Sequence, residues 1–323
     1  MREHILRLLR GQAEVSGQEL SQRLHISRAA VAKHVKALRQ AGYEIAASPG
    51  RGYRFMSAPD TLQAAEIASL LREQQAGWDI HYYEEVPSTT ALLRERAAAG
   101  APHGTVLVAE SQRAGEGRLE RAWYSPPGVG LWLSFLLRPP LTAQLAQTMT
   151  LLTACAVARV LERCGIAVGI KWPNDLLAPD GRKLCGIKSE LYLDLDSVKW
   201  LVTGLGLNID NESFPPELAD KATSLFLLAG RKLPRAPLAA ALLDELYRLY
   251  QTLLLEGFEP IRAIWLDYAV SLGQTVRVSN AQGEYYAVAR GLDENGYLLV
   301  ERAGRMETVT SGDILLAELG SIG

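Results

Sequence analysis

The stretch Lys171-Trp172-Pro173-Asn174-Asp175-Leu176, followed by Gly181-Arg182-Lys183-Leu184-Cys185-Gly186-Ile187, decides how this chain is interpreted. Apolar runs at 167–170 and 184–191 flank it, so the pattern predicts two buried strands joined by a cation-rich loop. Such a loop suits a ligand that carries a carboxylate and phosphates. A solvated hairpin turn would explain residues 178–181, but it does not explain an indole, a proline ring and an amide before the aspartate.

The length and composition indicate a soluble protein of several domains. A chain of 323 residues is too long for one ordinary core, so we expect two or three domains. Hydrophobic residues make up 48% of the chain and charged residues 22%, as in soluble globular proteins. No apolar run reaches membrane-spanning length, and the opening residues are amphipathic rather than signal-like. We therefore expect a cytoplasmic protein with no membrane partner.

The cysteines do not form a recognisable site. Cys155, Cys164 and Cys185 lack the spacing of a zinc site or a disulfide framework, and the five histidines are scattered. We therefore expect the cysteines to be small packing residues of a reducing compartment, and we expect no structural zinc.

The first 56 residues are basic, although the whole chain is slightly acidic. They hold ten Lys/Arg and four Asp/Glu, a net charge of +6, so the remainder carries −8 of the total of −2. A basic head on an acidic body indicates that nucleic acid binds to the head alone.

Three helical patterns and a hairpin make up this head. A capping box at 16–19 begins the second helix, and Ser27 caps the third, whose outward face carries only small residues and cations. A basic turn at 48–52 joins two short strands as a wing. The pattern predicts a winged helix-turn-helix, and a three-helix interaction domain with merely solvated cations is the alternative. The residues expected to contact DNA are Ser27, Arg28, Ala29, Lys33, Lys36 and Arg51.

Beyond residue 59, strands alternate with helices, which predicts an α/β sheet with helices behind it. The turn at 87–90 begins a helix, and its hydroxyls either cap that helix or also meet a ligand. A loop at 110–123 carries glycines and arginines, and its Gly115-Glu116-Gly117 lets backbone amides wrap an anion. The loop lacks the features of a dinucleotide fingerprint and of a Walker loop, and a mobile surface loop would look the same.

Two further patterns lie downstream. The strand at 201–209 contains Gly204-Leu205-Gly206-Leu207-Asn208, and alternate glycines leave one face bare for a flat ligand. A bulge or a tight packing contact is the alternative. After residue 271, short alternating strands separated by turns predict a small SH3-like barrel, which is either a passive cap or part of the ligand site.

Together these segments resemble the family of bacterial bifunctional biotin–protein ligases and biotin operon repressors, over nearly the whole chain. The specific motifs are Lys171-Trp172-Pro173-Asn174-Asp175 and the downstream Lys183-Leu184-Cys185-Gly186-Ile187, whereas the other segments are weak singly. The resemblance implies a multidomain α+β or α/β fold. We expect a winged helix-turn-helix at 1–58, a class II synthetase-like mixed sheet with helices at 59–270, and an SH3-like β-barrel at 271–323.

The resemblance also implies a reaction. In this family, biotin and MgATP give biotinyl-5'-AMP and pyrophosphate, and the biotinyl group then passes to a lysine of a biotin carboxyl carrier protein domain. The expected cofactors and substrates are therefore ATP, Mg²⁺ and biotin. Biotinyl-AMP also orders the loop over the site, favours a homodimer and acts as corepressor on operator DNA.

The same resemblance assigns roles to residues. Lys183 and Arg118 would relieve the repulsion between carboxylate and phosphate, and Asp175 would orient the incoming lysine or contact Mg²⁺. The residues expected to bind biotin are Ser88, Thr89, Thr90, Gln112, Gly115, Glu116, Gly117, Arg118, Lys183, Gly186, Gly204 and Gly206. The residues expected to bind ATP are Arg121, Trp123, Lys171, Asn174 and Asn208.

The chain departs from the family pattern at two places. The loop usually reads Gly-Arg-Gly-Arg-x-Gly-Arg, but here residues 115–121 carry Glu116 in place of a cation and Glu120 in place of a glycine. We expect Glu120 to be strained at a glycine's backbone angles, and the adenylate to form but to be held less tightly. Ala317 stands where relatives often have arginine, which weakens the expectation that the C-terminal module contacts the site.

Two rival functions stay open. A lipoate-type ligase would share the core, but it gives no reason for the Trp172-Pro173 turn or for the basic head. A ligand-sensing repressor without catalysis would keep the fold, and the two acidic residues in the loop are compatible with that alternative.

Overall fold

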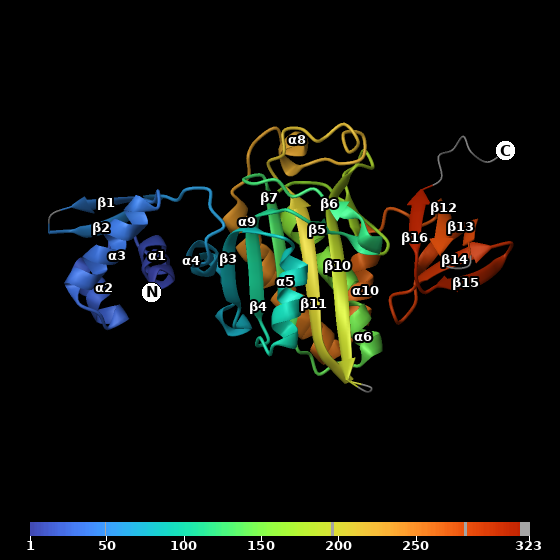
Figure 1. The fold of residues 1–323 in the computed structure, drawn as a ribbon, viewed down its shortest axis with the longest axis horizontal. Coiled ribbons are helices and arrows are strands. Elements are labelled where there is room, and N and C mark those ends of the chain that lie inside the picture. Colours follow the sequence, from blue (N-terminus) through green and yellow to red (C-terminus); the bar gives the residue numbers. More distant parts are fainter. Residues whose placement is uncertain (49, 195–196, 281–282, 317–323) are drawn as a thin grey trace.

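The computed structural model describes residues 1–48, 50–194, 197–280 and 283–316. Three bodies lie in a row: a helical head with its wing, a central sheet with its helices, and a small β module (Figure 1). The boundaries at residues 58 and 270 stay predictions.

The head folds as its capping residues indicate. Its elements are α1 (Arg2–Gly11), α2 (Gly17–Leu24), α3 (Arg28–Gln40) and the antiparallel wing strands β1 (Glu44–Ser48) and β2 (Gly52–Ser57). The Ser16 hydroxyl accepts a hydrogen bond from the Glu19 amide at 3.0 Å, and Ser27 accepts one from Ala30 at 3.1 Å. These caps fix where α2 and α3 begin. The predicted winged helix-turn-helix is confirmed.

A short helix, α4 (Ala64–Leu70), joins the head to the central body. Arg10 of α1 forms an ion pair with the buried Glu66 of α4 and also donates to Ser69. Helix α4 packs in turn on α9 (Arg235–Glu256). The head is therefore docked on the central body through α1 and α4.

The central body is built on a seven-stranded mixed sheet in the order β3-β4-β7-β11-β10-β9-β8. Only β3 and β4 run parallel, and every other neighbouring pair is antiparallel. The strands are β3 (Asp79–Val86), β4 (Thr105–Gln112), β7 (Gly130–Leu137), β8 (Gly169–Lys171), β9 (Asp175–Leu177), β10 (Lys183–Asp194) and β11 (Ser197–Asn208). The two strands expected around Asp175 are thus β8 and β10, and the loop between them holds a third strand, β9.

Helices cover both faces of this sheet (Figure 1). The further helices are α5 (Thr89–Ala98), α6 (Ala143–Gln147), α7 (Met149–Arg163), α8 (Leu225–Ala229) and α10 (Glu259–Tyr268), with 3₁₀ turns at Gln74–Ala76 and Arg118–Glu120. Helix α5 packs on one face, and α7, α9 and α10 form a layer on the other. Residues 143–163 are long and apolar enough to cross a membrane, but 72% of their most apolar window is buried, as in a core helix.

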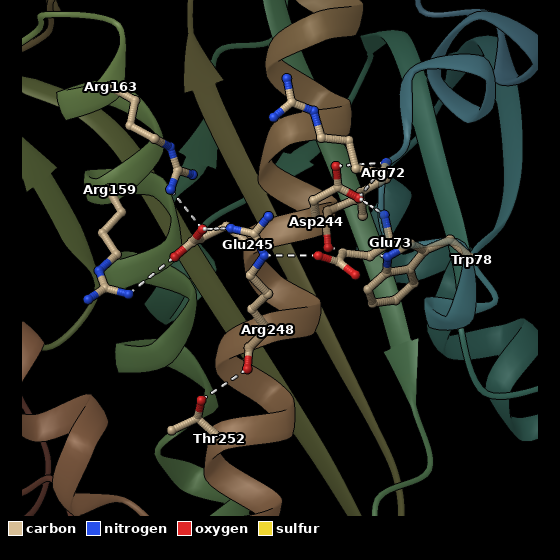
Figure 2. Close-up of polar contacts among 10 residues, drawn as sticks. Arg72, Glu73, Trp78, Arg159, Arg163, Asp244, Glu245, Arg248 and Thr252 are labelled. Atoms are coloured by element: carbon tan, nitrogen blue, oxygen red, sulfur yellow. Dashed lines mark hydrogen bonds and ion pairs between the residues drawn. The ribbon is translucent and has the colours of Figure 1, made fainter. Parts of the chain in front are cut away.

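Ion pairs fasten α9 to α7 and to the turn that follows α4 (Figure 2). The Glu245 side chain is 3% exposed and lies 2.9–3.4 Å from the guanidinium groups of Arg159, Arg163 and Arg248. Both oxygens of Asp244 accept hydrogen bonds from backbone amides of the turn at residues 72–73. One short acidic segment of α9 therefore holds three parts of the central body together.

The C-terminal module is a five-stranded antiparallel sheet in the order β15-β14-β13-β12-β16. Its strands are β12 (Thr275–Asn280), β13 (Gly283–Leu292), β14 (Leu298–Arg302), β15 (Arg305–Val309) and β16 (Asp313–Leu316). The predicted module of short strands is confirmed as an antiparallel β-sheet, and its closure into an SH3-like barrel stays a prediction. The Trp172 indole is buried and donates to the Gly296 carbonyl at 3.2 Å, which ties this module to the central body. This contact explains the indole that a simple turn left unexplained.

We expect Glu245→Gln to lower the free energy of unfolding by about 2 kcal/mol, because three arginines lose the buried charge that holds them. Arg248→Gln removes a single half-exposed partner, so it should cost less than about 1 kcal/mol. Urea unfolding followed by circular dichroism measures both values. Equal losses in the two variants would contradict a central role for Glu245.

Candidate active site

One buried carboxylate lies at the centre of the site. Asp175 is 8% exposed, and its oxygens lie 3.0 Å from Lys171 Nζ and 2.7 Å from Lys183 Nζ. Lys171 and Asp175 are directly paired between β8 and β9, and the Lys183 side chain reaches Asp175 from the start of β10, the strand that pairs with β9 on its other side. Burial by itself raises the pKa of the Asp175 carboxyl, but the charges of Lys183 and then Lys171 outweigh it, so the pKa lies below its usual value. Asp175 is therefore ionised near neutral pH and holds both lysines.

The loop arginine Arg118 joins this cluster from the other side. Its Nη1 donates to Asn174 Oδ1 at 3.1 Å and to Asp313 Oδ1 at 3.0 Å, and its Nη2 donates to the Gly312 carbonyl at 3.1 Å. Arg121 Nη1 lies 3.1 Å from the second oxygen of Asp313. The C-terminal module therefore contacts the site through Asp313. Ala317, where the contact was considered, lies outside the described residues.

A cavity of about 510 Å³ opens between the central body and the C-terminal module. It is lined by all the residues expected to bind ATP, namely Arg121, Trp123, Lys171, Asn174 and Asn208, and by Arg118, Asp175, Lys183, Arg277, Glu284 and Asp313. Asn208 is held by a hydrogen bond from its Nδ2 to the Thr223 carbonyl at 3.0 Å. The volume and the cation-rich wall suit a nucleotide with its phosphates.

A second, smaller pocket of about 40 Å³ adjoins this cavity at Arg118, Trp123 and Lys183. Its wall includes most residues expected to bind biotin, namely Thr89, Thr90, Gln112, Glu116, Gly117, Arg118, Lys183, Gly186, Gly204 and Gly206. Two expected residues do not line it. Ser88 caps α5 by accepting from the Ala91 amide at 3.2 Å, and Gly115 is buried in the pair of short strands β5 (Gly115–Glu116) and β6 (Ala122–Trp123).

The expectation that Gly204 and Gly206 leave a bare strand face is wrong. A Cβ atom at Gly206 would lie 2.1 Å from Trp123 Nε1, and one at Gly204 would lie 2.1 Å from Thr90 Oγ1. The glycines are needed because these side chains pack directly against the strand backbone. Trp123 Nε1 is buried, and it has no hydrogen-bond partner among the residues that the structure describes. The indole and the Thr90 hydroxyl thus fill the place predicted for a flat ligand.

The pocket is closed by a polar network that the sequence did not reveal in full. Gln112 Oε1 accepts from the Thr89 amide at 2.8 Å and from the Thr89 hydroxyl at 3.0 Å. The buried Ser134 hydroxyl lies 2.8 Å from Thr89 Oγ1 and 3.1 Å from Thr90 Oγ1. A lone serine inside the apolar strand at 130–137 was the signal that could have identified Ser134.

Glu116, the first departure in the loop, lies beside two cations. The Glu116 carboxylate lies 2.9 Å from Lys188 Nζ and 3.9 Å from Arg94 Nη1, so these cations offset its charge. The neighbouring Leu119 has a left-handed backbone conformation, with φ of 52°, and the strain expected at Glu120 stays a prediction. Lys188 lines the small pocket and was missed, although a lysine inside a buried-type strand is a visible signal.

The site offers little to a resident metal ion. Within the described ranges, no group of three or more His, Cys, Asp or Glu residues could hold one. The carboxylates Asp175, Glu284 and Asp313 line the larger cavity, and a magnesium ion that arrives with nucleotide phosphates needs only one or two. The residues therefore fit Mg²⁺ as part of a substrate.

The residues expected to contact DNA lie together on the head. Arg28, Ala29, Lys33 and Lys36 are exposed on one side of α3, and Ser27 caps that helix. Arg51 is exposed in the turn of the wing. A cationic helix face beside a cationic wing is the arrangement that a winged helix uses on a duplex.

Three family models match successive parts of the chain. They are an HTH domain at residues 2–54, the biotin/lipoate A/B protein ligase family at 82–208, and the biotin protein ligase C-terminal domain at 271–316. These ranges fall on the head, the central body and the β module.

Whole-chain relatives and solved structures agree with these models. The bifunctional ligase/repressor BirA of Bacillus subtilis is 38% identical over 309 residues and 95% of each chain, and that of Escherichia coli is 32% identical over 93% of this chain and 92% of its own. The biotin protein ligase of Aquifex aeolicus in complex with biotin and ATP aligns with a TM-score of 0.65 at 29% identity, over 74% of this chain and 98% of its own. The chain belongs to the biotin–protein ligase family, in its bifunctional ligase/repressor branch.

Proposed function

We propose that this protein activates biotin with MgATP to biotinyl-5'-AMP and transfers the biotinyl group to a lysine of a biotin carboxyl carrier protein domain. The observation that carries this proposal is that Lys183 and Arg118 line both cavities where they meet, with Lys171 on the wall of the larger one. A carboxylate and a triphosphate repel each other, and fixed cations between them stabilise the charge that develops as they join.

The cations and Asp175 act in different steps of the reaction. In the first step a biotin carboxylate oxygen bonds to the α-phosphorus and pyrophosphate leaves, so Lys183 and Arg118 face the atoms where charge builds up. In the second step the acceptor ammonium loses a proton to solvent, the resulting amine bonds to the acyl carbon, AMP leaves with its bridging oxygen, and the second amine proton also passes to solvent. Asp175 has a lowered pKa, so it is a weak base and a good partner for an incoming ammonium group. Magnesium enters with ATP as part of that substrate.

The test mixes the protein with MgATP, a labelled acid and an acceptor domain. We expect label from biotin on the acceptor and none from lipoate, because the family motifs and the basic head point to biotin. Transfer from lipoate would favour a lipoate-type ligase, and no transfer at all would favour a repressor without catalysis.

Lys183→Met should reduce adenylate formation about 10²- to 10³-fold, because a neutral side chain of similar length cannot stabilise the developing charge. Lys232→Met removes a largely exposed cation outside both cavities and is the matched control. Pyrophosphate release in single turnover measures the step. Full speed in Lys183→Met would refute the assignment.

We further propose that Glu116 weakens adenylate retention only when Lys188 no longer offsets its charge. Lys188→Met should therefore speed adenylate dissociation severalfold, by roughly 1 kcal/mol, and adding Glu116→Gln should reverse part of that change. Glu116→Arg with Glu120→Gly restores the family pattern, but it places a new cation beside Lys188 and Arg94. Additive effects in the Glu116–Lys188 cycle would contradict the pairing.

We also propose that the head binds operator DNA, with a homodimer formed in the adenylate-bound state. The support is the exposed cationic face of α3 beside the wing. Lys33→Ala with Lys36→Ala should lower the slope of log affinity against log salt by about 2 on a 40-base-pair duplex, because two phosphate contacts disappear. Lys199→Ala, on the central body, is the control. An unchanged slope in the double variant would place the DNA elsewhere.

A further inference from the structure

A buried arginine outside both cavities bridges two distant segments. Arg235, the first residue of α9, is 3% exposed. Its Nε donates to Asp60 Oδ2 at 2.7 Å, and its backbone amide donates to Asp60 Oδ1 at 3.0 Å. Its Nη1 donates to Glu110 Oε1 at 2.6 Å. The proposed chemistry uses none of these three residues.

Glu110 closes the base of the loop that carries Arg118 and Trp123. Its Oε1 also accepts from the Gly128 amide at 2.9 Å, so the carboxylate joins the two ends of the loop. Closer to the pocket, the Gln112 amide donates to the Ser125 carbonyl at 3.1 Å, and Gln112 Nε2 donates to Ser125 Oγ at 2.9 Å. We call Glu110, Gln112, Ser125 and Gly128 the loop neck. Gln112 is itself part of the pocket wall.

Asp60 belongs to the linker of the head. It lies three residues after the end of β2, and its side chain is 43% exposed, whereas Leu62 is fully buried in the central core. Arg235 therefore binds the linker close to the point where the chain leaves the wing. One set of hydrogen bonds joins Thr89 to Gln112 and Gln112 to Ser125, and a second set joins Gly128, Glu110, Arg235 and Asp60. The short chain segments 110–112 and 125–128 connect the two sets, so the pocket is linked to the linker through the loop neck.

The charge of the buried guanidinium resists separation of Arg235 from Asp60 and Glu110. A guanidinium stays charged in proteins, so a buried one depends on its carboxylate partners. If the linker draws Asp60 away, Arg235 either follows it and leaves Glu110, or stays with half of its partners lost. Either outcome disturbs the loop neck, because the Glu110 Oε1 atom that accepts from Arg235 also accepts from the Gly128 amide.

We propose that Arg235 is a positioning residue that fastens the loop neck to the linker of the head, so that closure of the loop depends on how the linker is held. The element with two arrangements is the loop between Arg113 and Pro127, which is open or closed over the pocket. The effect on adenylate and biotin binding rests on the proposed function, whereas the effect on the loop itself does not.

The chain offers a matched pair of variants. Asp60→Ala removes one carboxylate partner of an α9 arginine next to the loop neck. Glu73→Ala removes the carboxylate 3.0 Å from Arg248 Nε on the same helix, away from the loop (Figure 2). Both carboxylates are partly exposed, so each variant should fold. Arg235→Lys keeps the charge but, as a point donor, cannot span both carboxylates as the guanidinium fork does.

The first readout needs no ligand. Arg113 and Arg121 are 67% and 71% exposed, so trypsin reports on the loop, and mass spectrometry identifies each cut. We expect loop cleavage to rise about threefold to fivefold in Asp60→Ala and Arg235→Lys, with cleavage of the head unchanged. Glu73→Ala should match the wild type. Equal loop cleavage in Asp60→Ala and Glu73→Ala, or a rise spread over the whole chain, overturns the proposal.

The second readout is kinetic and rests on the proposed function. In Asp60→Ala the adenylate should dissociate about threefold to fivefold faster and the KM for biotin should rise, while kcat changes little, because the loop that is closed over a bound ligand still places Arg118 as in the wild type. A fall in kcat at constant KM overturns the proposal. If the wild type makes no adenylate, the proposed function fails, and the cleavage readout alone decides the role of Arg235.

Discussion

The pairing of one buried carboxylate with two lysines is the interaction on which the site depends. The ammonium groups of Lys171 and Lys183 both lie within 3.0 Å of the Asp175 carboxylate, whose negative charge offsets their mutual repulsion. The same charges keep the Asp175 carboxyl ionised despite its burial. The site is therefore assembled before any anion arrives, with fixed cations instead of mobile solvent at the place where phosphate would bind.

Two bodies of the protein build this site together. The loop arginines Arg118 and Arg121 share the single carboxylate of Asp313 in the C-terminal module, and Trp172 anchors that module through the Gly296 carbonyl. An incoming polyphosphate competes with Asp313 for the same guanidinium groups. The module is therefore no passive cap: it sets how tightly the loop arginines are held and how much of their charge is available to a ligand.

The loop is nearly closed over its own pocket. Trp123 packs on the backbone at Gly206, and about 40 Å³ is left beside it, which is too little for a bicyclic ring with an aliphatic tail. Entry of such a ligand requires the indole to move, and the contacts of the loop neck decide how easily that happens. The loop and the linker of the winged head are therefore coupled, since Arg235 donates hydrogen bonds both to Glu110 at the base of the loop and to Asp60 in the linker.

The sequence by itself determined the three-part architecture, the capped recognition helix and most of the pocket residues. The architecture and the capped helix follow from local signals, namely caps, charge distribution and strand alternation, whereas the pocket residues follow from the family resemblance carried by the Lys-Trp-Pro-Asn-Asp and Lys-Leu-Cys-Gly-Ile motifs. It did not determine that Trp123 covers Gly206, that Lys188 offsets Glu116, or that Asp313 and Arg235 contact segments more than 100 residues away. Tertiary structure decided these contacts, because residues distant along the chain meet only when strands pair and helices pack. A local sequence pattern does not specify which distant residue a side chain will contact.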